Sequence, residues 1–139
     1  MFNISIEVLD ILDEKEFWDE VHEEYGFNLR KDLKSCELNR KDYNCLFKDI
    51  MEDTKYLPST CRGTPMTRCN NSVAYKIRYK DEKRKIGASG GYRLIFILVH
   101  NQKVLPLHLY HKKDKKDLTE QEKKNLAKFL KDIDEEFEV

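Results

Sequence analysis

The sequence predicts an α+β fold in which helices pack on a small antiparallel sheet and a last helix ends the chain. Three observations predict it. Apolar and polar side chains alternate near the amino terminus, helical apolar patterns follow, and the second half holds three strand-like segments before a final helical pattern. The length of 139 residues is typical of one domain, so we predict a single domain spanning residues 1–139.

The first half is expected to contain one strand, two helices and a loop. Strict alternation predicts a strand over residues 2–8. Asp13, with a glutamate three residues later, forms a capping-box pattern for a first helix that Gly26 is suited to end. A second amphipathic helix is expected over residues 40–53. Residues 54–72 are rich in turn-forming residues and are expected to form a loop.

The second half is expected to form three antiparallel strands. In residues 73–80 alternation places the basic side chains on the face opposite the apolar ones; the basic residues are Lys76, Arg78 and Lys80. Residues 92–100 are apolar on both faces, which predicts a central strand covered on both sides. In residues 103–111 alternation directs Leu105, Leu107 and Leu109 to one face, and His108 and Tyr110 to the other.

The last helix has a clear start in the sequence. Thr119 and Glu122 form a second capping box. Apolar residues follow at helical spacing and predict the buried face of this helix; they are Leu126, Phe129, Leu130, Ile133 and Phe137.

The net charge is zero, yet the charges are segregated along the chain. Residues 7–24 hold nine acids and one base, whereas residues 76–116 hold twelve Lys or Arg and three acids. Residues 132–138 add five acids and no base. We expect a strongly positive field around the second half, although charge runs are also what solvated faces look like.

The four cysteines point to neither a disulfide framework nor a metal site. Cys36, Cys45, Cys61 and Cys69 form none of the close pairs that hold zinc, so we expect free thiols, no metal and no cofactor. The apolar runs are too short to span a membrane, and the start has no secretory pattern. The expected location is the cytoplasm.

The residues of the second half that could bind or cleave a substrate are predicted to form one cationic surface. If the predicted faces coincide, the basic residues of 73–80 lie beside His108 and Tyr110, with Arg93 on the strand between them. Lys112 and Lys113 follow the last strand. Arg and Lys bind phosphates, while Tyr and His stack on bases, so this surface suits a phosphodiester chain. Walker, zinc-protease and serine-hydrolase motifs are absent from the sequence.

Three segments together resemble the RelE/ParE/HigB superfamily of toxins. They are a K-x-R strand at Lys76–Arg78, a strand start Gly90-Gly91-Tyr92-Arg93, and a strand end Leu109–Lys113 followed by Asp117-Leu118-Thr119-x-x-Glu122. The resemblance implies a RelE-like fold and the toxin of a toxin–antitoxin system. It also implies a metal-independent endoribonuclease that cleaves mRNA, in some members on the ribosome. Two alternatives stay open: a non-catalytic ParE-like inhibitor of gyrase, and a nucleic-acid-binding module.

The resemblance also implies roles for individual residues. The residues expected to be catalytic are Arg93, Tyr110, His111 and Lys112. Those expected to bind substrate are Lys76, Arg78, Lys80, His108 and Lys113. Either imidazole or Lys112 is a candidate acid or base, and Lys113, Lys115 and Lys116 form a basic cluster expected to be solvated. His111 and its neighbour Tyr110 should face opposite sides of the strand, so only one of them is expected to reach a shared substrate.

The implied partners are a cognate antitoxin, mRNA and the ribosome, with no membrane. An acidic antitoxin segment would be attracted to the surface around Arg93 and Lys112. The internal alternative is self-inhibition by the acidic tail, residues 132–138, or by the acidic first helix.

Overall fold

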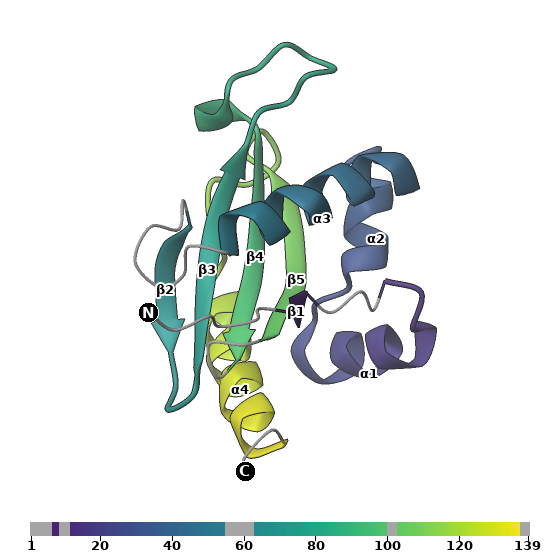
Figure 1. Ribbon diagram of the computed structural model, residues 1–139. Coiled ribbons are helices and arrows are strands. Elements are labelled where there is room, and N and C mark those ends of the chain that lie inside the picture. The colour runs from purple at the N-terminus through teal and green to yellow at the C-terminus, as the bar shows by residue number, and fades with distance from the viewer. Residues whose placement is uncertain (1–6, 9–11, 55–62, 100–102, 137–139) are drawn as a thin grey trace.

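The computed structural model describes residues 7–8, 12–54, 63–99 and 103–136. The elements are, in chain order, β1 (Glu7–Val8), α1 (Lys15–Tyr25), α2 (Leu29–Ser35), α3 (Arg40–Thr54), β2 (Thr64–Arg68), β3 (Ser72–Tyr79), the 3-10 turn η1 (Ala88–Gly90), β4 (Tyr92–Val99), β5 (Lys103–His111) and α4 (Glu120–Glu136). Figure 1 shows the strands side by side, with α3 crossing in front of them. The predicted α+β class, antiparallel sheet and C-terminal helix are confirmed.

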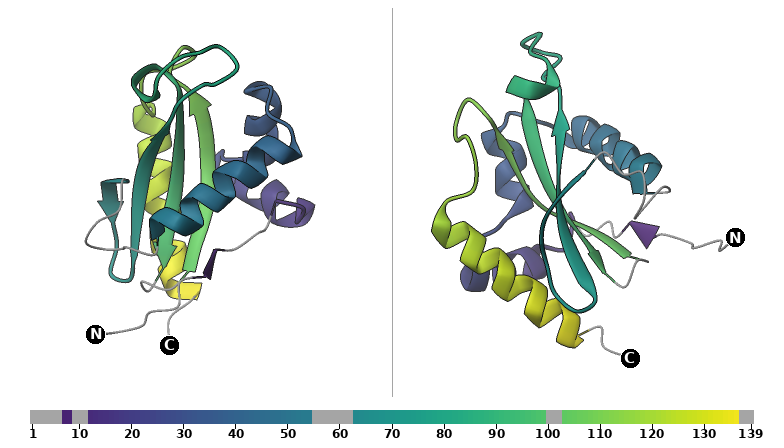
Figure 2. Two further views of the ribbon diagram at one scale, coloured as in Figure 1. Left: turned by 45° about the horizontal axis from the view of Figure 1, so that its top comes forward. Right: turned by 90° about the vertical axis from the view of Figure 1, so that its left-hand side faces the viewer.

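The sheet has the strand order β1-β5-β4-β3-β2. Strands β2 to β5 pair antiparallel, while β1 pairs parallel with the start of β5. Helices α3 and α4 lie on opposite sides of the sheet, as the right-hand view of Figure 2 shows. Every residue of β4 is buried, which confirms the predicted central strand. Its apolar side chains supply the middle of a core that both helices share.

The register of β3, β4 and β5 decides which side chains share a face. Arg78, Arg93 and Tyr110 are opposite one another in one row, because Arg78 pairs with Arg93 and Arg93 with Tyr110. The next row is Lys76, Ile95 and His108. We call the side that carries these two rows the α4 face, and the side that carries Tyr79, Tyr92 and His111 the α3 face. The predicted coincidence of the basic and aromatic faces is therefore confirmed for these residues.

A bulge in β5 overturns one prediction about this strand. Ile95 pairs with His108 and Phe96 with Pro106, so Leu107 is an extra residue. Leu105 therefore lies on the α4 face and Leu109 on the α3 face; the prediction that all three leucines share a face is wrong. Proline has no N–H to donate to the ladder, and bulges are one of the few places where a sheet tolerates it.

The first half departs from the predictions in three places. Residues 64–68 form β2, so the predicted loop over 54–72 is wrong there. Helix α2 was not predicted; Asn28 caps it by accepting hydrogen bonds from two backbone N–H groups. The residue that precedes α1 is Glu14, with no side-chain cap, so the capping role predicted for Asp13 is wrong. The predicted strand 2–8 is described only at its last two residues.

Other helix predictions are confirmed. Gly26 ends α1 with φ of 79°, a left-handed conformation that glycine adopts without strain. Helix α3 begins at the predicted residue. At the start of α4 the backbone N–H of Thr119 donates to the Glu122 carboxylate, and the Thr119 hydroxyl accepts from the Glu122 N–H, at 2.9 and 3.1 Å. The apolar stripe of α4 is buried from Leu126 to Ile133; Phe137 lies outside the described residues.

Candidate nucleic-acid interface

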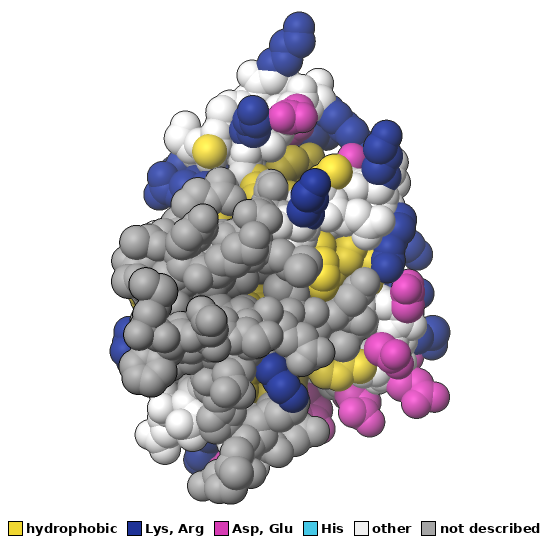
Figure 3. Space-filling view, in the orientation of Figure 1, with side chains coloured by type: hydrophobic (Ala, Val, Ile, Leu, Met, Phe, Trp, Pro, Cys, Tyr) yellow, Lys and Arg dark blue, Asp and Glu magenta, His cyan; other side chains and the backbone are white. Residues whose placement is uncertain are grey.

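Eight lysine and arginine side chains gather at one end of the molecule. We call this the basic end; it consists of the end of β3, the β3–β4 loop and the β5–α4 loop, with Arg78, Lys80, Lys83, Arg84, Lys85, Lys112, Lys113 and Lys116. Blue side chains mark the loop at the top of Figure 3. The acidic α1 and the end of α4 lie toward the opposite end in Figure 1. The segregation of charge along the sequence is therefore also a segregation in space.

Arg93 lies within the α4-face row but is buried, at 3% exposure. Its guanidinium donates hydrogen bonds to the carbonyl oxygens of Ala88 and Ser89, both at 2.8 Å, and to that of Tyr92 at 3.2 Å. Burial, together with the neighbouring charge of Arg78, lowers the pKa of Arg93. The guanidinium thus binds the backbone of η1, and within the described residues its hydrogen-bond acceptors are carbonyl oxygens rather than an anion.

His108 is the centre of a polar cluster on the same face. Its Nδ1 lies 2.8 Å from Oδ2 of Asp32, and the same oxygen accepts the backbone N–H of Leu109 at 3.0 Å. An ionised carboxylate oxygen can only accept hydrogen bonds, so Nδ1 must be the donor in this contact. In a neutral imidazole the single N–H proton is therefore on Nδ1. Nε2 then carries the lone pair. Asp32 belongs to α2, and this helix contacts β5. Strand β1 pairs only with the first two residues of β5, Lys103 and Val104, so it does not cover the part of the strand that carries His108.

Lys115 and Glu122 complete this cluster. Nζ of Lys115 lies 3.0 Å from Nε2 of His108 and 2.6 Å from a carboxylate oxygen of Glu122. The same ammonium lies 4.9 Å from the centre of the Tyr110 ring. Burial acts to raise the pKa of Glu122, but the hydrogen bonds from Lys115 and from the Thr119 N–H outweigh it and lower that pKa. The expectation that Lys115 is solvated is therefore wrong, since it is half-buried and paired.

Tyr110 packs beneath this cluster. It is 5% exposed, and its phenol oxygen has no hydrogen-bond partner among the residues that the structure describes. Burial, followed by the nearby Asp117 carboxylate, raises the pKa of Tyr110 to about 12. Lys76, predicted to bind substrate, lies 3.7 Å from Asp117. The phenol is therefore a neutral group at physiological pH, enclosed by the β5–α4 loop.

His111 lies on the α3 face, away from Tyr110, as the alternation along β5 predicts. Its Nε2 lies 2.9 Å from Oδ2 of Asp81, and both side chains are 1% exposed. Asp81 also accepts hydrogen bonds from the backbone and the guanidinium of Arg84, at 3.1 and 2.9 Å. Burial opposes ionisation of Asp81, but the bonds from Arg84 and His111 outweigh it and lower its pKa. This network ties the β3–β4 loop to the end of β5.

The predicted site residues therefore divide into three groups. Arg78, Lys80, Lys112 and Lys113 are exposed at the basic end. Lys76, Arg93, His108 and Tyr110 share the α4 face but are half-buried or buried. His111 is separate. Sequence reasoning missed Asp32, Asp81 and Glu122; Glu122 was identified only as a capping residue, and the other two have no motif that marks them.

In the described part of the chain, no group of three or more His, Cys, Asp or Glu residues is arranged to hold a metal ion. Cys36, Cys45 and Cys69 are free thiols, while Cys61 lies outside the described residues. No helix within those ranges has the length and apolar character that crossing a bilayer requires. No protein-family model, curated protein or solved structure matches this chain.

Proposed function

We propose that this chain is a toxin with a RelE-like fold that cleaves mRNA without a metal ion, on the ribosome or free of it. One observation carries the proposal: the strand register aligns Arg78, Arg93 and Tyr110 in a row, with His108 in the next. RNA cleavage through the ribose 2′-hydroxyl uses these residue types. Cations stabilise the phosphorane, an imidazole moves the proton, and an aromatic ring stacks on a base.

His108 is the general base in this proposal, in place of His111, because it shares the face of the cationic row. Asp32 holds the proton on Nδ1, so Nε2 takes the proton of the 2′-hydroxyl. The 2′-oxygen then forms a bond to phosphorus while the bond from phosphorus to the 5′-oxygen breaks. Lys115, beside Nε2, gives its proton to the leaving 5′-oxygen. The products are a 2′,3′-cyclic phosphate and a 5′-hydroxyl.

Access to His108 requires the β5–α4 loop to move. The His108 side chain is 9% exposed, and the Lys115–Glu122 pair covers it. Both partners of this pair are about a quarter exposed, so water screens their attraction and weakens it. In this proposal an RNA phosphate replaces the Glu122 carboxylate as the partner of Lys115 and so opens the site.

Primer extension on cellular mRNA after induction of the protein tests the proposal. We expect new 5′ ends within coding regions, and we expect them to fall by at least about 100-fold in the His108→Gln variant, because general base catalysis contributes about that much or more. His22→Gln is the matched control, since His22 is exposed on α1 at the acidic end. If folded His108→Gln protein still cuts like the wild type, His108 is not the base.

A second candidate is a ParE-like toxin that inhibits gyrase without catalysis. Burial favours it: of the four residues that the resemblance marks as catalytic, Arg93, Tyr110 and His111 are at most 5% exposed, while Lys112 is exposed. Induction would then give elongated cells and DNA damage while mRNA stays intact. A binding module without toxicity would instead leave growth unaffected, and its affinity for nucleic acid would fall steeply with salt.

An external antitoxin is the inhibitor that we propose for either toxin. The basic end offers a charge-complementary surface to an acidic segment of such a partner. The acidic tail of this chain is already engaged elsewhere: Asp132 accepts a hydrogen bond from the Tyr25 hydroxyl, and Asp134 accepts the backbone N–H of Asn71 at 3.0 Å. These contacts lie at the end of the molecule away from the basic loops (Figure 1), which argues against self-inhibition by the tail.

A further inference from the structure

A cleft of about 590 Å³ opens at the basic end, on the α3 side of the sheet. It lies between the β3–β4 loop and the stretch from the end of α2 into α3. In Figure 3 hydrophobic atoms show between the loop at the top and the helix below it. A volume of about 300–1,000 Å³ is typical of small-molecule sites. The cleft is separate from the His108 cluster, which lies on the α4 face.

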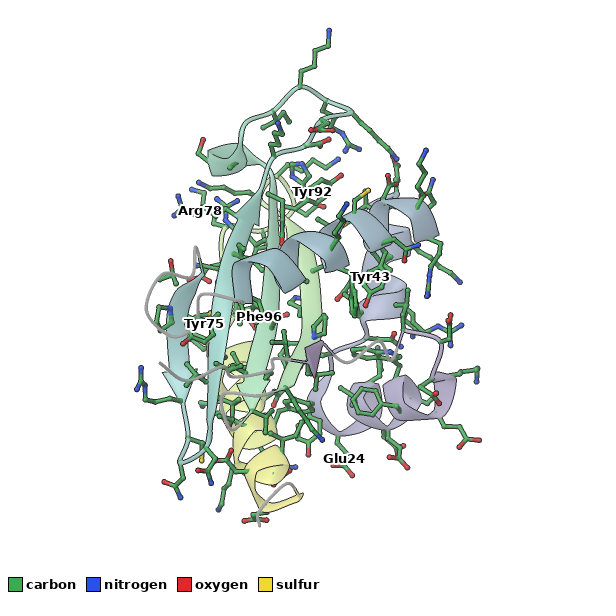
Figure 4. All side chains as sticks on the ribbon, in the orientation of Figure 1. Glu24, Tyr43, Tyr75, Arg78, Tyr92 and Phe96 are labelled. Atoms are coloured by element: carbon green, nitrogen blue, oxygen red, sulfur yellow. The ribbon has the colours of Figure 1, made fainter. Side chains whose placement is uncertain are left out.

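The interior of this cleft is apolar and aromatic. Tyr79 and Tyr92 are opposite each other on β3 and β4, and both line the cleft. Figure 4 shows Tyr92 between the β3–β4 loop and α3. Leu38 and Leu46 line it from the helical side, and the exposed Cys45 lies beside them. Tyr79 and Tyr92 are 7% and 4% exposed, so each offers the cleft a small part of its ring surface. A nucleobase can pack its π-face on such aromatic and apolar surface.

Three cations and three acids line the cleft, and two of the acids, Asp42 and Glu82, are paired with two of these cations. The cations are Lys80 and Lys83, with Arg78 at the edge of the cleft, where it also belongs to the α4-face row. Asp81 is bonded to Arg84 and His111, and Asp42 binds Lys83 at 3.1 Å and the backbone N–H of Asn39 at 3.0 Å. Glu82 is 77% exposed and pairs with Lys80 at 3.4 Å. Exposed pairs of this kind are weak, so a phosphate competes with Glu82 for Lys80.

The cleft is preformed rather than loose. The Asp81 network fixes one side of the β3–β4 loop, and Arg93 fixes the other through its bonds to Ala88 and Ser89. Gly91 brings the loop against β3 so closely that a Cβ there would lie 2.1 Å from the Tyr79 carbonyl oxygen. A preformed site loses less conformational entropy when it binds a ligand.

We propose that this cleft binds one nucleotide of an RNA chain, with the base between the tyrosine and leucine walls and the phosphate at Lys80 and its neighbouring cations. The inference rests on the proposed function, because it assumes that the ligand is RNA. It deepens that function by adding a site for an uncleaved nucleotide on the side of the sheet opposite His108.

Alkylation of Cys45 by iodoacetamide reports on the cleft directly. The four ribonucleoside 5′-monophosphates, each at millimolar concentration, are tested as protecting ligands, and peptide mass spectrometry measures the modification of each cysteine. We expect at least one nucleotide to slow the alkylation of Cys45 by threefold or more. Cys69, a partly exposed thiol next to the β2–β3 turn, is the internal control and should be unaffected. Ribose 5-phosphate should not protect, because it lacks the base.

Two variants separate the base from the phosphate. Cys45→Trp fills the cleft from an exposed helical position and should weaken nucleotide binding by at least tenfold in calorimetry, whereas Cys45→Ser should not. Lys80→Gln should lower affinity for the nucleotide and leave affinity for the nucleoside unchanged. Equal protection by ribose 5-phosphate, no protection by any nucleotide, or unchanged binding by folded Cys45→Trp would each overturn the inference. RNA cleavage is scored separately, so a cleft that fails leaves the His108 test intact.

Discussion

Replacing Asp81 with alanine should destabilise the fold, because a buried carboxylate holds three donors. The change leaves the Nε2–H of His111 buried without its acceptor, which costs about 1–3 kcal/mol, and removes the bond to the Arg84 backbone, worth about 1 kcal/mol. The Arg84 guanidinium is one-third exposed and can rehydrate, so its lost bond adds little. The sum is about 3 kcal/mol. With a urea m-value of about 2 kcal/mol per M, the unfolding midpoint falls by about 1.5 M.

The difference in the free energy of unfolding between the wild type and Asp81→Ala should also depend on pH, which gives a second measurement. The pKa of Asp81 is lower in the folded protein than its ordinary value of about 3.9. Its stabilising contribution is therefore complete above pH about 5, begins to fall near the ordinary pKa, and is lost as the pH falls through the folded-state pKa. Urea unfolding curves should show a constant gap between wild type and Asp81→Ala from pH 7 to about 5, narrowing below that. A gap under about 1 kcal/mol at pH 7, or one that does not narrow in acid, would refute the reasoning.

Two further substitutions test local packing. Gly91→Ala places a Cβ 2.1 Å from the Tyr79 carbonyl oxygen and should lower the free energy of unfolding by about 3 kcal/mol in urea, whereas Gly87→Ala, with nothing within 4 Å, should change it by less than about 0.5 kcal/mol. Thr119→Ala removes the capping hydroxyl of α4 and should cost about 1 kcal/mol, seen as a fall of about 3 °C in thermal unfolding. Thr119→Ser keeps the hydroxyl and should change little; equal losses in the two Thr119 variants would show that the cap is not the cause.

Much of the fold could be predicted because its signals are local. The capping box at Thr119, the left-handed Gly26 and the apolar run of β4 each follow from a few neighbouring residues. Strand β2 has no such signal, since its short polar sequence contains a proline and becomes a strand only by pairing with β3. The bulge at Leu107 also has no local signal, because the pairing of β5 with β4 decides where the extra residue lies.

The candidate site was predictable only in part, for a physical reason. Alternation on each strand placed Arg78 and Tyr110 on faces that the register then brought together. Burial was not visible, because it depends on the β5–α4 loop folding back and on α2 lying along β5. Asp32 lies 76 residues from His108 in sequence, so no spacing rule connects them. Arg93, a cation at the start of an apolar strand, donates its hydrogen bonds to the carbonyl oxygens of η1. The sequence predicts an anionic partner for such a cation and does not reveal these backbone acceptors.

The separation of basic and acidic ends gives this neutral chain a permanent dipole moment. A polyanion exerts no net pull on a neutral particle at long range, but its field exerts a torque on a dipole and turns the basic end toward it before contact. The same dipole favours head-to-tail attraction between copies in dilute salt. Both effects fade as added ions shorten the Debye length to about 10 Å at 0.1 M. The orientation of first encounter is therefore set by the dipole and not by the net charge, and ionic strength controls how strongly it is imposed.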